Sequence, residues 1–146
     1  MTKFFTQSDI RLLIETTITV ESRREHSRLI VNGTIYSKGD ITFCIYKEST
    51  ESGEVNHTIK IDARSRSITV SRSGAVSMRQ RFIPSQKTEG TYHTPYGSLP
   101  VTTLAKKIQF TWDDKQKKGT LLLAYDLWIQ GNYTGFYTVK IHMEGV

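Results

Sequence analysis

The longest runs of this sequence alternate hydrophobic and polar side chains with a period of two residues. One such run lies near the start of the chain and has apolar or β-branched residues at Ile10, Leu12, Ile14, Thr16, Ile18 and Val20. Two more lie near its end, within 120–130 and 133–144. A period of two places alternate side chains on one face of a β-strand. The runs exceed the usual strand length of about 5–6 residues. Long strands with one buried face reach a common interior by curling into a barrel.

Shorter alternating segments separated by turns fill the middle of the chain. We predict strands at 10–20, 27–36, 41–47, 55–62, 66–72, 76–83, 102–112, 120–130 and 133–144, with a further short strand at 91–94 as an option. Residues 84–100 contain all three prolines and are predicted to be irregular. The whole chain, residues 1–146, is predicted to be one all-β domain, a single antiparallel up-and-down barrel of about 8–10 strands.

Composition and charge narrow the environment in which such a barrel works. The single cysteine, Cys44, cannot form an internal disulfide, which favours a reducing compartment. Residues 1–9 show no export signal, and no apolar run approaches the ~20 residues of a membrane helix. We therefore expect a cytoplasmic protein without a membrane partner. The net charge of +6 is spread along the chain, which favours a solvated surface over a nucleic-acid site.

Polar residues on faces that the alternation predicts to be buried are the candidates for function. Four such residues are His57, Arg72, Gln80 and Lys106. Arg72 either reaches out of the barrel end and caps backbone carbonyls or holds an anionic group of a ligand. Gln80 is either a hydrogen-bonded core amide or a ligand contact. His57 is more often a core histidine than a ligand, and Lys106 is best explained by a β-bulge that turns it to water.

No motif for catalysis, metal binding or cofactor binding occurs in the sequence. The four histidines lack metal-ligand spacing, and Cys44 has no cysteine partner for zinc. Cys44 is predicted to lie on the strand face opposite Phe43 and Ile45, which are predicted to point inward with Ile41. Nucleophile elbows, P-loops and dinucleotide fingerprints are absent from the sequence. We therefore expect neither a metal nor a cofactor, and an enzyme is the least supported class.

Aromatic residues predicted to point outward suggest two kinds of macromolecular partner. These are Tyr36, Tyr46, Trp128 and Phe136, and the predicted outward cations are Arg79 and Arg81. Bases of a single strand stack on such aromatics above a basic groove. The pair Trp128 and Phe136 can equally form the contact of a homodimer. We rank the homodimer above nucleic acid, because nothing in the sequence shows that the aromatic and basic residues adjoin.

Residues 72–107 resemble the YwiB-like family of uncharacterised bacterial proteins. The segments that carry the resemblance are 72–76, 80–82, 95–97, the pair Thr102 and Thr103, and the later 125–127, together with Met78, Gly90 and Tyr92. The resemblance implies a lipocalin-like, or calycin-type, barrel, in agreement with the alternation. It also implies a cytoplasmic bacterial protein and implies no activity.

The leading hypothesis is a non-enzymatic barrel that binds a small, partly apolar ligand. Its polar end is predicted to consist of Arg72, Gln80, Tyr92, Thr94 and Tyr96, and its apolar lining of Met78, Phe82, Leu104, Phe110 and Leu123. The hypothesis requires an interior cavity of about 300 Å³ or more. In the alternative, the tyrosines seal the barrel end and Arg72 satisfies loop carbonyls. An interaction barrel, acting as a homodimer or a protein-binding module, is the second hypothesis.

Overall fold

Ten antiparallel strands make up almost all of the computed structural model, which describes residues 5–146. The first four residues, part of the segment searched for an export signal, lie outside that range. The strands are β1 (Phe5–Val20), β2 (Arg23–Lys38), β3 (Ile41–Thr50), β4 (Gly53–Asp62), β5 (Ser67–Gly74), β6 (Ser77–Phe82), β7 (Lys87–Thr94), β8 (Gly97–Asp113), β9 (Lys118–Ile129) and β10 (Asn132–Gly145). Each strand pairs with its neighbour in the chain, and β1 pairs with β10. The predicted up-and-down barrel is confirmed.

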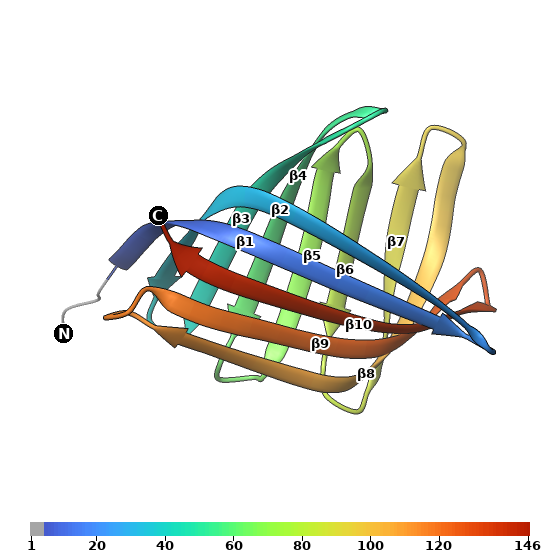
Figure 1. Ribbon diagram of the computed structural model, residues 1–146. Coiled ribbons are helices and arrows are strands. Elements are labelled where there is room, and N and C mark those ends of the chain that lie inside the picture. The colour runs from blue at the N-terminus through green and yellow to red at the C-terminus, as the bar shows by residue number, and fades with distance from the viewer. Residues whose placement is uncertain (1–4) are drawn as a thin grey trace.

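The barrel is flattened into two layers whose strands cross. The long strands β8, β9, β10, β1 and β2 form one layer, and β3 to β7 form the other (Figure 1). Strands that pass from one layer to the other make the corners of such a barrel, by bending or through a bulge. Here these strands are β2 and β8, the two that pair with both layers.

The wall is incomplete at both corners because each corner strand pairs with the second layer over only part of its length. Residues 33–38 of β2 pair with β3, whereas residues 23–32 pair with β1 alone. Residues 97–104 of β8 pair with β7, whereas residues 107–113 pair with β9 alone. Pairing of β2 with β3 begins at Gly33, and a bulge at Lys106 lies where β8 leaves β7. Each corner is therefore a place where a cavity can open.

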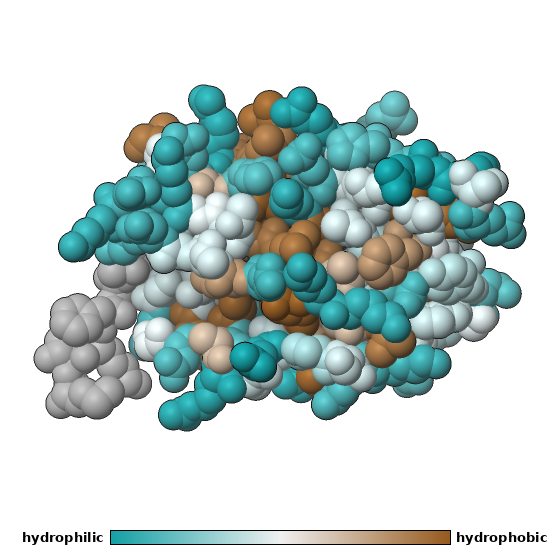
Figure 2. Space-filling view, turned by 60° about the horizontal axis from the view of Figure 1, so that its bottom comes forward, coloured by the Kyte–Doolittle hydropathy of each residue, from teal (hydrophilic) through white to brown (hydrophobic). Residues whose placement is uncertain are grey.

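Hydrophobic side chains of both layers pack together in the interior of the barrel. The fully buried ones include Ile10, Leu12 and Ile68, and Phe82 and Leu123 belong to the same cluster. Phe110 packs against this cluster from β8. In the space-filling view, hydrophobic residues gather toward the middle of the face and hydrophilic residues surround them (Figure 2). The predicted lining by Phe82, Phe110 and Leu123 agrees with this packing, and Met78 lies on the same inward face above it.

Three details differ from the sequence-based prediction. On β3 the buried residues are Cys44 and Tyr46, so the prediction that Ile41, Phe43 and Ile45 point inward is wrong. Phe43 instead stacks on Tyr36, with ring centroids 5.0 Å apart. Both faces of β3 carry apolar residues, and alternation alone cannot choose between them.

The segment 84–100 is the second difference, because it is a hairpin rather than an irregular loop. Pro100 lies in β8 opposite Thr91, and Pro84 forms a bridge with Ala105. The third difference is Leu104, which alternates with the buried residues Thr103 and Ala105 and pairs with Asp126. Leu104 therefore lies on the outer face and does not line the barrel. The bulge that follows it reverses the alternation, as predicted for Lys106, which is exposed.

Candidate functional site

The corner between β2 and β3 opens into a cavity of about 530 Å³. Cavities that hold small ligands measure about 300–1,000 Å³, so the size meets the requirement of the sequence-based hypothesis. Its lining comes from the unpaired part of β2, from the ends of β3 and β4, and from strands deeper in the barrel. The lining residues are Ile14, Thr16, Ser27, Arg28, Leu29, Tyr46, Glu48, Thr50, Ser52, Val55, His57, Arg72, Val76 and Tyr92.

One row of side chains crosses β3 to β7 at the floor of this cavity, and all of its members except Met78 line the cavity. Each member lies directly opposite the next in the strand register, and the members in order are Tyr46, His57, Arg72, Met78 and Tyr92. Such cross-strand neighbours on one face of a sheet are in contact range. The next row toward the core contains Cys44, Ile59, Val70 and Gln80. The polar floor therefore separates the open end from the packed core.

His57 and Glu48 form a hydrogen-bonded pair in the cavity wall. The Nε2 of His57 donates to Oε1 of Glu48 at 2.9 Å, and the imidazole stacks on the ring of Tyr46 with centroids 4.3 Å apart. Burial lowers the pKa of His57, and the nearby charge of Arg72 lowers it further, against the opposing effect of Glu48. His57 is therefore a neutral imidazole near pH 7, and its Nε2–H donates a hydrogen bond to the carboxyl group of Glu48.

Glu48 was missed in the sequence, where residues 48–54 are naturally taken as a polar loop. In the structure β3 continues to Thr50. Alternation from the inward residues Cys44 and Tyr46 predicts that Glu48 also points inward. This prediction requires knowing beforehand which face of β3 is buried. His57, by contrast, lies on the inward face as the alternation predicts and is buried.

Arg72 brings a positive charge into the interior. Its Nε is buried and has no hydrogen-bond partner among residues 5–146. Burial raises the pKa of both Tyr46 and Tyr125 to about 12, and the charge of Arg72 acts against that rise at each phenol. The guanidinium therefore acts electrostatically on both phenols, and it carries a hydrogen-bonding group that has no partner within residues 5–146.

Gln80 lies below the cavity and bridges a gap between strands. Pairing of β6 with β7 extends only over residues 77–79 of β6. Beyond it, Nε2 of Gln80 donates to the hydroxyl oxygens of Thr103 at 2.8 Å and Thr88 at 3.2 Å. The two hydroxyls are also hydrogen-bonded to each other at 2.9 Å. This favours the core-amide interpretation of Gln80 over the ligand contact.

Thr94 ends β7 and Tyr96 lies in the β7–β8 turn, and neither residue lines the cavity. The hydroxyl of Thr94 donates to the carbonyl of Gly97 at 2.9 Å and accepts from the backbone N–H of Tyr96 at 3.1 Å. The side chain of Tyr96 is 99% exposed. The prediction that these two residues join the polar end is wrong, because the segment that carries them forms a tight hairpin turn. Tyr96 does not seal the barrel either.

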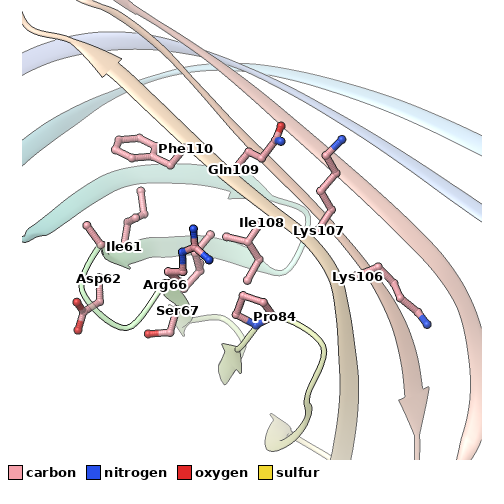
Figure 3. Close-up of a pocket in the computed structure, with 12 residues that line it drawn as sticks. Ile61, Asp62, Arg66, Ser67, Pro84, Lys106, Lys107, Ile108, Gln109 and Phe110 are labelled. Atoms are coloured by element: carbon pink, nitrogen blue, oxygen red, sulfur yellow. The ribbon is translucent and has the colours of Figure 1, made fainter.

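A second cavity, of about 540 Å³, lies at the corner where β8 leaves β7. Its apolar wall includes Ile61, Ile108 and Phe110, whereas the side chains of Lys106 and Lys107 point away from it (Figure 3). Ser67, a buried polar residue in its wall, is hydrogen-bonded to Ser65 at 2.7 Å. The other polar side chains of this lining are exposed or half-buried, whereas the β2–β3 corner has the buried His57, so that corner is the better candidate site.

The predicted outer-surface residues are only partly where the alternation puts them. Tyr46 is buried and stacks on His57, so it is not an outward aromatic. Trp128 is in contact with Tyr133 on the outer face, and Nζ of Lys87 lies 5.0 Å from its ring centroid. Arg79 and Arg81 are exposed on β6. The homodimer through Trp128 and Phe136 stays a prediction.

Within residues 5–146, no group of three or more histidine, cysteine or carboxylate side chains is arranged to hold a metal ion. The described part of the chain also contains no helix with the length and apolar character needed to cross a membrane.

Comparisons with known proteins identify relatives over almost the full chain. The family model described as "Domain of unknown function (DUF1934)" matches residues 12–141. The uncharacterized beta-barrel protein YwiB of Bacillus subtilis (strain 168) is 28% identical over 139 residues, which cover 95% of each chain. The crystal structure of the ywiB protein from Bacillus subtilis has a TM-score of 0.85 and 28% identity, and the match covers 96% of this chain and 93% of that one.

Proposed function

We propose that this chain, which belongs to the DUF1934 family of domains of unknown function, binds a small, partly apolar molecule at the β2–β3 corner. Membership of that family agrees with the resemblance of residues 72–107. The observation that carries the proposal is the division of the cavity wall. Ile14, Leu29, Val55 and Val76 supply apolar surface, and the polar row on β3 to β5 supplies groups that can orient a bound molecule.

Binding agrees better than catalysis with the chemistry of the wall. Burial raises the pKa of the Cys44 thiol to about 12, so the nucleophilic thiolate is not populated near neutral pH. The hydrogen bond of His57 goes to Glu48, which is no nucleophile for a histidine base to activate. The wall therefore supports recognition of a molecule rather than a reaction of it.

A pair of neighbouring positions on β2 provides the test. Leu29 lines the cavity, whereas Ile30 is 62% exposed on the opposite face of the same strand. We expect the wild-type protein to bind the neutral fluorescent probe N-phenyl-1-naphthylamine, with a blue-shifted and enhanced emission. Leu29→Trp fills the cavity and should weaken probe binding by at least about tenfold. Ile30→Trp, the matched control, should leave probe binding unchanged.

Either of two outcomes contradicts the proposal. One is failure of the wild-type protein to bind the probe, and the other is equal binding by the two tryptophan variants. Native mass spectrometry of protein purified from its own host adds an independent measurement. We expect a retained small-molecule mass in the wild type and in Ile30→Trp, and its loss in Leu29→Trp.

We also propose a lipocalin-like assignment and a cytoplasmic location for the protein. The assignment is supported by the closed up-and-down meander of ten strands around a cavity that is open at one corner. The location is supported by the single, buried and reduced Cys44, which suits a reducing compartment.

A further inference from the structure

We propose that the molecule bound at the β2–β3 corner carries one carboxylate and that Arg72 holds it. This inference rests on the proposed function, because it names the class of ligand that the same cavity takes. The ligand is accordingly an amphiphilic monocarboxylate, with its charged group at the floor and its apolar part along β1 and β2.

The hydrogen-bonding state of Arg72 is the first step of the argument. A buried polar group without a partner costs free energy, and native structures rarely leave one unused. The Nε of Arg72 is such a group: it has almost no accessible surface, and it meets a ligand when the side chain of Arg72, a residue that lines the cavity, turns toward it. The guanidinium edge that carries Nε–H also carries a parallel terminal N–H, and a carboxylate accepts from both at once.

The second step is that the protein supplies no counter-ion for this cation. None of the ion pairs found within residues 5–146 includes Arg72. Glu48, the carboxylate in the cavity wall, is instead hydrogen-bonded to His57 at 2.9 Å. A buried charge without a pair is costly, so an anion from outside has the most to gain at this position.

The charges in the wall favour a single negative charge on the ligand. Arg72 and the exposed Arg28 are the cations of the lining, and Glu48 is its anion. With His57 neutral, the lining carries a net charge of one positive unit. A monocarboxylate balances this net charge, whereas a dianionic group such as a phosphate would leave a net negative charge in the cavity.

The surroundings of Arg72 account for the apolar part of the ligand. Tyr92 lines the cavity at the far end of the row that contains Arg72. Leu29 and Ile14 face the floor from the other layer. A chain or ring attached to the carboxylate therefore finds hydrophobic contacts along the same cavity that takes its charged end.

The test compares three probes of equal chain length and different charge. Decanoate, decanol and decylamine each compete with N-phenyl-1-naphthylamine for the wild-type protein. We expect decanoate to displace the probe at a concentration at least about tenfold lower than decanol, and decylamine to be the weakest of the three. This comparison needs no variant, so it holds whether or not substitutions at Arg72 fold.

Two variants then assign the preference to one residue. Arg72→Gln removes the charge at the floor and should abolish the preference for decanoate over decanol while N-phenyl-1-naphthylamine still binds. Arg28→Gln removes the exposed cation at the entrance and should keep that preference. Thermal unfolding of both variants checks that each is folded.

The outcomes separate this inference from the proposed function. If decanoate and decanol compete equally in the wild type, or if Arg72→Gln keeps the preference, the carboxylate inference is overturned while cavity binding stands. If the naphthylamine probe does not bind the wild type, the proposed function fails with it.

Discussion

At the scale of single residues, the interior is shaped by positions where a side chain would not fit. A Cβ at Gly90 would lie 2.3 Å from Oε1 of Gln80 and 2.4 Å from the carbonyl oxygen of Arg79. A Cβ at Gly33 would lie 2.5 Å from the carbonyl oxygen of Ile45. The first glycine leaves room for the amide that bridges β6 and β8, and the second lets β2 approach β3 closely at the corner.

We predict that Gly90→Ala destabilises the protein by about 1–3 kcal/mol, the usual cost of overpacking a filled interior. The crowding comes from a backbone oxygen as well as from Gln80, so rotation of one side chain cannot relieve it. Urea unfolding measures the change. Gly39→Asn is the control, because Gly39 lies in a turn with open space around it and Asn tolerates its positive φ of 62°. Equal stability of Gly90→Ala and wild type would contradict the crowding.

We predict that His57 makes the protein less stable in acid. Its pKa is lowered in the folded state from the ordinary value of 6.5, with burial as the largest cause. Below pH 6.5 the unfolded chain therefore binds the proton more readily than the folded one, and stability falls as the pH falls. The slope has an upper limit of about 1.4 kcal/mol per pH unit for one group.

Urea titrations above and below pH 6.5 check this sign against His57→Gln, which keeps a donor for Glu48 but does not titrate in that range. We expect the wild type to lose more stability on acidification than the variant does. A wild type that instead gains stability relative to the variant would mean that Glu48 dominates the pKa.

At the scale of strands, sequence alternation predicted each strand better than it predicted which face is buried. Strands with a strict pattern, such as β1, β4 and β9, have the predicted inward residues. On β3 the choice failed, because Phe43 finds an aromatic partner outside the barrel in Tyr36. In β10 a bulge between Tyr133 and Gly135 moves Tyr133 to the outer face, and no charged residue on the inward face marks this bulge in the sequence as Lys106 marks the one in β8.

The candidate site was predicted in part for the same reason. Arg72 and Tyr92 share one row because β5 and β6 keep the predicted faces and β7 pairs with β6. Glu48 depends on the face of β3, and Thr94 and Tyr96 depend on how a proline- and glycine-rich segment turns. A strand tolerates proline at its end, or at a position whose backbone nitrogen does not have to donate a hydrogen bond to the neighbouring strand. Proline content alone therefore could not exclude a hairpin.

The corner strands lead to a prediction about hydrogen exchange. Residues 23–32 of β2 pair with β1 alone, whereas residues 33–38 pair on both sides. We expect amides in the first half of β2 to exchange faster than those in the second half, because their outer edge is open to water. Exchange followed by mass spectrometry resolves the two halves. Bound decanoate should slow exchange in the first half, and uniform protection along β2 would contradict an open corner.

At the scale of the whole molecule, closure of the barrel by neighbouring strands links the core to the cavity. The contacts of β1 with β10 join the two ends of the chain, and Val146 donates its backbone N–H to the carbonyl of Asp9 at 3.0 Å. Because β1 begins and β10 ends on the same side of the barrel (Figure 1), a linker can join these two ends while one of the other turns is opened. The barrel therefore depends on strand pairing more than on any one turn.

Circular permutation tests this dependence, and the two corners make its result specific. In both permutants a short flexible linker joins the two ends of the sequence. Opening the chain at the exposed Tyr96 cuts the β7–β8 turn, and only residues 97–100 of β8 have β7 as their sole partner strand. We expect it to fold with a loss of about 1–2 kcal/mol. A chain opened at Glu21 frees residues 23–32, which have β1 as their only partner, from the turn that connects them to it. The entropy of bringing that long segment back to β1 should cost more, and the cavity wall at the β2–β3 corner should be lost with it.

Thermal unfolding and binding of N-phenyl-1-naphthylamine distinguish the two permutants. Equal stability and equal probe binding would show that the first half of β2 forms its wall without the turn, contrary to the pairing seen here.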